Sequence, residues 1–229
     1  VVTGAQHQDL IQMQANYITI RGNTFIGSAD SAIDYDAWNG QPNNHQIYNN
    51  VFILIRGSGI RYYASGGTSL TSLQNIFISN NTFVDHTSRH QWAISATNFN
   101  GNPTLSNVFI KNNIFHNCVD PVYVSSSSGF TEADWNFDYN LVSAGVDGTT
   151  YVTLNGNSYT QSHPRTGTPQ FIGYSRNSES SNLHLSESDI AAKDQGVSLS
   201  AYYVIDKDGN ARPQGSYWDI GAYEYNPTL

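Results

Sequence analysis

The sequence predicts an all-β solenoid in which successive coils stack through parallel strands. Three observations predict it: a recurring motif of apolar residues and asparagine, a composition poor in helix formers, and short apolar runs that return in a fixed order. The 229 residues include 25 asparagines, 26 serines and 19 glycines, against four glutamates and three lysines. Because asparagine, serine and glycine favour turns over helices, the composition favours short strands joined by many turns.

The motif Ile-x-x-Asn-x-Phe marks the coils. Its asparagines are Asn23, Asn50, Asn81, Asn113 and, in a weakened copy, Asn140. The steps between them are 27, 31, 32 and 27 residues, too long for a meander of hairpins and typical of one solenoid coil. Equivalent residues of parallel coils lie above one another, so the motif predicts interior columns of Ile and Phe and a ladder of asparagine amides.

A second apolar run follows each motif, at residues 32–35, 59–63, 92–95 and 121–124, so each coil has at least two strands. Side chains of a strand alternate between its two faces. We expect one column of each run to point into the core: Ile11, Ile33, Ile60, Ile94 and Val122. The next residues then form an outward column: Gln12, Asp34, Arg61, Ser95 and Tyr123. A second outward column lies two residues further on: Gln14, Asp36, Tyr63, Thr97 and Ser125.

The coil motif and the C-terminal sequence together resemble the right-handed parallel β-helix (pectate-lyase-like) family of secreted proteins. The C-terminal match is Asp-Lys-Asp-Gly-Asn-Ala-Arg-Pro at 206–213 and Asp-Ile-Gly-Ala-Tyr-Glu-Tyr at 219–225, which resembles the segment that closes many of these proteins. The resemblance covers most of the chain. It implies a right-handed single-stranded solenoid with about five recognisable coils, and it places polysaccharide lyases, epimerases and glycoside hydrolases among the relatives.

We expect one domain over residues 1–229, with regular coils to 145 and the last coils and closing segment over 146–229. Members of the family usually begin with a cap over the open core, since terminal repeats need a polar outer face. Coil-like sequence starts here within about ten residues. We therefore expect a truncated N-terminus, with further chain upstream.

The net charge and the hydropathy of the sequence exclude two classes of binding partner. The formal net charge of −8 repels phosphate backbones, so nucleic acid is not an expected partner. No stretch approaches the roughly 20 apolar residues of a membrane helix, so membrane insertion is not expected.

The single cysteine, Cys118, forms neither an intrachain disulfide nor a cysteine zinc site. The resemblance implies a secreted or extracellular protein whose partner is a polysaccharide or glycan, although the residues from Val1 onward show no signal-peptide pattern.

Candidate catalytic residues lie on the first three coils. For β-elimination from a uronate, a base removes a proton while a cation spreads the developing negative charge. Arg61 is the candidate charge neutraliser, and Tyr63 and His7 are the candidate proton carriers. For hydrolysis, two carboxylates flank the scissile bond, and Asp34 with Asp9 on the adjacent coil is the candidate pair. Neither set of candidate residues is specific to one reaction, so the sequence does not distinguish elimination from hydrolysis.

Calcium is the cofactor that the lyase alternative would use. Carboxylate oxygens suit Ca²⁺, and Asp9, Asp34 and Asp36 are its candidate ligands. The simpler alternative is that Asp34 and Arg61 form only a surface ion pair, worth under about 1 kcal/mol. In the tail, Asp206–Asn210 resembles a calcium loop, but a turn is favoured because no bidentate glutamate follows at the right distance.

Candidate substrate-binding residues are polar or aromatic. Gln12, Gln14 and Tyr123 lie on the same outward face, and His90 and Trp92 belong to a longer excursion that could form one wall of a groove. Aromatic rings stack on sugar rings, although a tryptophan at the start of a strand is more often part of a core. In the tail, we expect Asp219 and Glu224 to bond the backbone groups that close the last coil.

A non-catalytic solenoid is the alternative function. Such a protein would serve as a glycan-binding module, an adhesin, a tailspike-like spacer or a filament subunit. An open solenoid end presents unpaired strand edges, which are a template for homo-oligomers or end-to-end assembly. The absence of an unmistakable catalytic motif in the sequence motivates this alternative.

Overall fold

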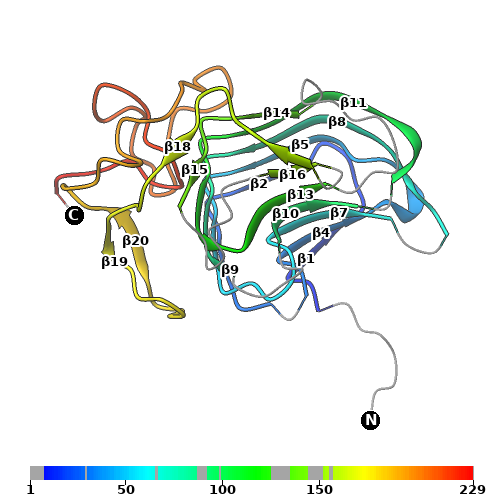
Figure 1. The fold of residues 1–229 in the computed structure, drawn as a ribbon, viewed down its shortest axis with the longest axis horizontal. Coiled ribbons are helices and arrows are strands. Elements are labelled where there is room, and N and C mark those ends of the chain that lie inside the picture. Colours follow the sequence, from blue (N-terminus) through cyan, green and yellow to red (C-terminus); the bar gives the residue numbers. More distant parts are fainter. Residues whose placement is uncertain are drawn as a thin grey trace, which may run out of the picture.

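The chain winds into a parallel β-helix, which confirms the predicted fold class (Figure 1). The structure is a computed structural model and describes residues 8–28, 30–64, 67–86, 92–97, 99–124, 135–143, 152–154 and 157–228. Three parallel sheets, here called A, B and C, run along the solenoid. Following sheet B from its first strand to its fifth takes the chain through four turns.

Each coil contributes one strand to each sheet. Sheet A contains β1 (Ile11–Met13), β4 (Ile33–Asp36), β7 (Ile60–Tyr63), β10 (Trp92–Ala96), β13 (Asp120–Val124) and β16 (Val152–Leu154), and ends with the antiparallel β17 (Asn157–Tyr159). Sheet B contains β2 (Thr19–Arg21), β5 (Asn43–Tyr48), β8 (Leu70–Ser79), β11 (Phe99–Lys111) and β14 (Trp135–Asp138). Sheet C contains β3 (Thr24–Ile26), β6 (Val51–Ile53), β9 (Thr82–His86), β12 (Ile114–Cys118), β15 (Leu141–Val142) and β18 (Arg165–Thr166).

Beyond the coils, the hairpin of β19 (Phe171–Gly173) and β20 (Asn182–Leu185) belongs to a closing segment, residues 160–228, that otherwise consists mainly of turns and loops. The one helical element in the described residues is a single 3₁₀ turn, η1 (Ala37–Asn39). Within the described part of the chain, no helix has the length and apolar character needed to cross a bilayer.

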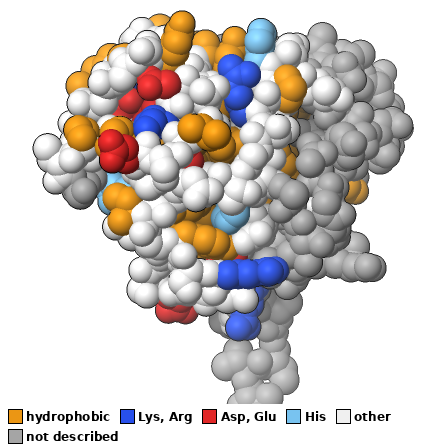
Figure 2. All heavy atoms as spheres, turned by 60° about the vertical axis from the view of Figure 1, so that its left-hand side comes forward, with side chains coloured by type: hydrophobic (Ala, Val, Ile, Leu, Met, Phe, Trp, Pro, Cys, Tyr) orange, Lys and Arg blue, Asp and Glu red, His pale blue; other side chains and the backbone are white. Residues whose placement is uncertain are grey.

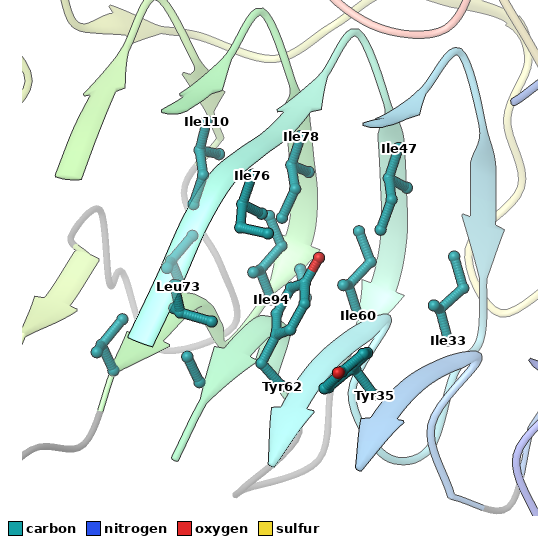
Figure 3. Close-up of a cluster of buried hydrophobic side chains, with 14 of the residues drawn as sticks. Ile33, Tyr35, Ile47, Ile60, Tyr62, Leu73, Ile76, Ile78, Ile94 and Ile110 are labelled. Atoms are coloured by element: carbon teal, nitrogen blue, oxygen red, sulfur yellow. The ribbon is translucent and has the colours of Figure 1, made fainter. Parts of the chain in front are cut away.

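The core consists of stacked columns, as the motif predicts. Ile11 pairs with Ile33, Ile33 with Ile60, Ile60 with Ile94 and Ile94 with Val122, so the predicted register of sheet A is confirmed. In Figure 3 the isoleucines of sheet B face this column across the core. The motif phenylalanines also stack, with ring centroids 4.9, 4.5 and 5.2 Å apart from Phe25 through Phe52 and Phe83 to Phe115. Each such buried side chain stabilises the fold by about 1.5–3 kcal/mol.

The predicted asparagine ladder forms at the turn between sheets B and C. The Oδ1 atom of Asn81 accepts hydrogen bonds from the backbone N–H and the side-chain amide of Asn50, at 3.0 and 3.1 Å. Asn113 and Asn140 repeat the arrangement on the next two coils. The ladder ends on Gln161, whose Oε1 accepts from the backbone N–H of Asn140 at 2.7 Å. Every coil is therefore bonded to the next through buried amides, which a continuous turn column requires.

The asparagine before the ladder residue has a second role in three coils. Asn49, Asn80 and Asn112 have positive φ angles of 54°, 48° and 55°, a conformation that asparagine tolerates better than most residues. Their amides point outward and bond the closing segment. The Nδ2 atoms donate to carbonyl oxygens of Ile205, Asp219 and Val197, at 2.7, 2.9 and 2.7 Å.

These contacts correct the expected position of the closing segment. It does not simply close the last coil but runs back along the outside of the solenoid, across three coils and as far as the first, where Lys207 Nζ donates to the Gly22 carbonyl at 3.2 Å. Asp219 and Glu224 do bond backbone groups, as expected. Asp219 accepts from the N–H of Asp194, and Glu224 from the N–H of Asp219 itself.

A buried ion pair organises the closing segment. Arg212 and Glu224 are both fully buried, and their Nη1 and Oε1 atoms are 2.5 Å apart. Arg212 also donates to the Gly221 carbonyl and to Asn49 Oδ1. The Asp206 carboxylate is used by the backbone as well, because its Oδ1 atom accepts from two N–H groups of the same loop and its Oδ2 atom from the N–H of Glu224. This arrangement supports the turn interpretation of residues 206–210.

The contribution of Asp219 to protein stability is expected to fall as the pH rises from about 4, the ordinary pKa of a carboxyl group, toward neutrality. Burial, and then the neighbouring Glu224, raise the pKa of Asp219 in the folded state. The folded protein therefore holds this proton more tightly than the unfolded chain does, and the stabilisation is lost as Asp219 ionises. The check is the thermal unfolding midpoint across this range for the wild type and for Asp219→Asn. An equal slope in the two proteins contradicts the assignment.

Candidate functional site

The outward face of sheet A carries a charged cluster centred on Arg61. The register pairs Asp34 on β4 with Arg61 on β7, and the guanidinium Nε lies 2.6 Å from Asp34 Oδ1. Nη1 lies 3.1 Å from Asp30 Oδ1, and Nη2 lies 3.8 Å from Asp9 Oδ1. We call these four residues, Asp9, Asp30, Asp34 and Arg61, the Arg61 cluster.

The Arg61 cluster combines residues from three coils. Asp9 precedes β1, and its Oδ1 accepts from the backbone N–H of Ser31 at 3.0 Å. The sequence identifies Asp9, Asp34 and Arg61 as candidates, and the structure brings all three together. Asp30 was not predicted because it lies in the turn before β4, outside the alternating pattern that assigns faces.

The cluster is more buried than a surface ion pair. Exposure of the side chain is 0% for Asp34, 3% for Asp9, 20% for Arg61 and 34% for Asp30. Burial raises the pKa of Asp9, and the nearby Asp34 carboxylate raises it further. Among the described residues, Asp34 Oδ2 and Arg61 Nη2 have no hydrogen-bond partner. Unsatisfied polar atoms of this kind are rare in folded proteins and indicate a strained or functional position.

Two further predicted residues lie beside the cluster. The Arg61 guanidinium carbon is 5.5 Å from the centre of the half-buried Tyr63 ring, within the range of a cation–π contact. Asp36 pairs in register with Tyr63 and is buried. Gln12 and Gln14 are exposed on the first coil. Of the predicted catalytic groups, the structure thus places Tyr63 next to Arg61.

An aromatic pair lies further along the same face, with Trp92 one coil and Tyr123 two coils beyond Arg61. Trp92, at the start of β10, stacks on Tyr123 of β13, with ring centroids 4.3 Å apart and planes 12° from parallel. Both side chains are half-buried. His7 and His90, the remaining predicted site residues, lie outside the described residues. One aromatic residue that the sequence interpretation missed is Trp38, which is 58% exposed in the 3₁₀ turn after β4.

Calcium would have to share the cluster with the guanidinium. Arg61 already contacts three of the carboxylates, including the candidate ligands Asp9 and Asp34. In the described part of the chain, no three His, Cys, Asp or Glu side chains are grouped to hold a metal ion. Among the described residues, the positive charge in contact with Asp9, Asp30 and Asp34 is that of Arg61.

Comparison of the chain with protein-family models, with curated proteins and with solved structures gives no match.

Proposed function

We propose that the protein is a secreted, carbohydrate-active β-helix related to the pectate-lyase-like family and that it hydrolyses a polysaccharide at the Arg61 cluster. The observation that carries this proposal is the pair of carboxylates Asp9 and Asp34 on one guanidinium in different environments. Asp34 is bonded directly to Arg61, whereas Asp9 is 3.8 Å away and has a raised pKa. A pair of carboxyl groups in different environments is the usual arrangement in the active site of a glycosidase.

In this assignment Asp9 is the proton donor and Asp34 the ionised partner. A raised pKa extends the pH range over which Asp9 keeps its proton, as a general acid for the leaving oxygen requires. The Arg61 guanidinium fixes the orientation of the Asp34 carboxyl group in the cluster through the short Nε–Oδ1 contact. The buried Oδ2 atom of Asp34 has no hydrogen-bond donor among the described residues, so it keeps lone pairs for a water molecule that reaches the cluster.

Hydrolysis is favoured over β-elimination by the charge of the cluster. An eliminating enzyme needs a cation that is available to the uronate carboxylate. Arg61 is already engaged by Asp9, Asp30 and Asp34. A uronate placed beside it would have to displace one of these carboxylates from the guanidinium, so a neutral or weakly charged glycan suits this face better.

The polymer would lie across the strands of sheet A. Coils repeat about every 4.8 Å along the solenoid, so a chain of sugars crossing them meets successive side chains of the outward columns. Gln12 and Gln14 supply amides on the first coil, and the stacked Trp92 and Tyr123 supply an aromatic surface beyond Arg61. Aromatic faces and amides are suited to the apolar faces and hydroxyls of sugars.

A non-catalytic glycan-binding solenoid is the second candidate. The observation that favours it is burial, because Asp9 and Asp34 expose only 3% and 0% of their side chains. A buried cluster of this kind would fix the coils against one another without touching substrate.

The decisive experiment is incubation of the protein with a panel of neutral glycans and polyuronates, followed by two assays. One measures new reducing ends, and the other the ultraviolet absorbance of unsaturated uronates. Hydrolysis predicts new reducing ends without unsaturated products. Unsaturated products would overturn it in favour of elimination, and glycan binding without any new ends would support the second candidate.

A further inference from the structure

A cavity of about 540 Å³ opens where the closing segment meets the coil that carries β14 and β15. From it we infer that the protein has a second carbohydrate site, separate from the Arg61 cluster, that binds a neutral sugar unit. Tyr139, Arg165, Asp194 and Tyr217 line the cavity together with the backbone of residues 195–198. Its volume is in the range of small-ligand sites. The choice of a sugar as ligand rests on the proposed function, whereas the existence of the cavity does not.

The cavity lies where the column of outward asparagines, Asn49, Asn80 and Asn112, ends. On three coils an outward asparagine bonds the closing segment, the last being Asn112, which donates to the Val197 carbonyl and accepts from the Val197 N–H. The equivalent position on the next coil is Tyr139, which has the same positive φ, 56°. A tyrosine does not reproduce the amide contacts, so the closing segment leaves the solenoid here and a space remains beneath it.

The aromatic wall of the cavity is held in place. The Tyr139 ring stacks on His163, with centroids 4.5 Å apart and planes 17° from parallel. His163 is fixed in turn by Asp138, which accepts from its backbone N–H at 2.6 Å and bonds its Nδ1 at 2.8 Å. The guanidinium carbon of Arg165 lies 5.3 Å from the centre of the Tyr139 ring. Ordered side chains of this kind reduce the entropy lost when a ligand binds.

The polar wall is equally fixed. Arg165 Nε donates to the Gln195 carbonyl at 3.0 Å. Asp194 Oδ1 accepts from the Tyr217 N–H at 2.7 Å, which positions this carboxylate beside the tyrosine. A Cβ atom on Gly215 would lie 2.5 Å from the same oxygen, so glycine is needed there for the carboxylate to occupy its place.

These groups match a neutral sugar better than a charged one. Tyr217 is 65% exposed beside the cavity and offers a ring face to the C–H face of a sugar. Arg165 and Asp194 offer a donor and an acceptor for neighbouring hydroxyls, and their charges cancel. Figure 2 looks onto this side of the molecule, where the acidic and basic side chains of the described residues are interspersed. Among the described residues that line the cavity, one arginine and one aspartate offset each other, so the lining has no excess of positive charge to attract an acidic sugar.

The site is distinct from the Arg61 cluster in position. The closing segment packs on the turn between sheets B and C, whereas Arg61 projects from the outer face of sheet A. In Figure 1 the closing segment lies on the opposite side of the solenoid from β4 and β7. A polysaccharide held here would be tethered away from the site of cleavage.

The test uses the full chain and four probes, the neutral disaccharides maltose, cellobiose and lactose and the charged digalacturonate, with binding measured by titration calorimetry. We expect at least one neutral disaccharide to bind, and Tyr217→Ala to weaken that binding by about tenfold or more. Tyr217 is exposed, so its truncation leaves the fold intact. Arg165→Gln, which removes the guanidinium, is expected to weaken binding as well.

Two controls separate this site from the Arg61 cluster. Tyr17→Ala removes a tyrosine that is 81% exposed on the first coil and should leave binding unchanged. Asp9→Asn should also leave it unchanged, so binding that depends on Tyr217 stands even if no glycan is hydrolysed. Absence of binding by all three neutral disaccharides, preferential binding of digalacturonate, or equal binding by Tyr217→Ala and the wild type overturns the inference.

Discussion

An Asp9→Asn variant is expected to lose glycan turnover by about 10²–10⁴-fold, the contribution of a positioned general acid. Asparagine has nearly the same shape as aspartic acid, and its Oδ1 still accepts the Ser31 N–H bond that Asp9 makes. It has no carboxylic proton to deliver. The change should therefore act on the chemical step, with glycan binding retained, and the measurement is the rate of new reducing ends at saturating substrate.

The matched control for Asp9→Asn is Asp208→Asn. Asp208 lies in the closing segment, where its carboxylate bonds His184 at 2.7 Å and is 38% exposed. This variant makes the same chemical change outside the Arg61 cluster and should keep full turnover. If Asp9→Asn remains as active as the wild type, Asp9 is not the proton donor and the cluster is structural. The unfolding midpoint of each variant shows whether a loss of rate reflects a loss of fold.

An Arg212→Met variant is expected to lose about 3–5 kcal/mol of unfolding free energy, the usual consequence of leaving one charge of a buried pair without its partner. Methionine fills much of the arginine volume but leaves the Glu224 carboxylate buried. It also removes the hydrogen bonds to Asn49 and to the Gly221 carbonyl. Urea unfolding measured by tryptophan fluorescence tests this directly, because the Arg212 guanidinium carbon lies 5.6 Å from the centre of the buried Trp218 ring.

Two companion variants make the Arg212 result interpretable. Arg21→Met changes an exposed arginine on β2 and should alter stability by no more than about 0.5 kcal/mol. Arg212→Met combined with Glu224→Leu removes both charges, so its cost should be smaller than the sum of the two single changes. A cost below about 1 kcal/mol for Arg212→Met alone would show that the pair adds little to the docking of the closing segment.

The periodic part of the fold could be read from the sequence because each coil repeats the same local choices. One isoleucine column assigned the faces of sheet A, and the structure has the same residues in register from Ile11 to Val122. The ladder asparagines followed from the same argument. Asp34 and Arg61 of the candidate site also fell on one face because stacked coils place equivalent positions side by side, and Asp9 lies just before the strand of the adjacent coil.

Features that depend on contacts distant in sequence could not be read in this way. The outer asparagines left a signal, the doubled Asn-Asn at 49–50, 80–81 and 112–113, but nothing local shows that they bond a segment more than 80 residues away. The burial of Asp34 depends on neighbouring turns, and Asp30 enters the cluster from one of them. His45 lies wholly within the core, bonded to the Ala15 carbonyl and to Tyr62, although its polar neighbours in sequence suggest a surface.

The path of the closing segment along the coils changes how the solenoid is expected to unfold. In a simple repeat array each unit touches only its neighbours, so coils can fray one at a time from an end. Here the closing segment is bonded to Gly22, Asn49, Asn80 and Asn112 at once. Its release breaks contacts on four coils together, and it can dock only after those coils have formed. The closing segment therefore couples the coils into one cooperative unit and slows unfolding from the first coil. Resistance to proteolysis is then a property of all the coils together.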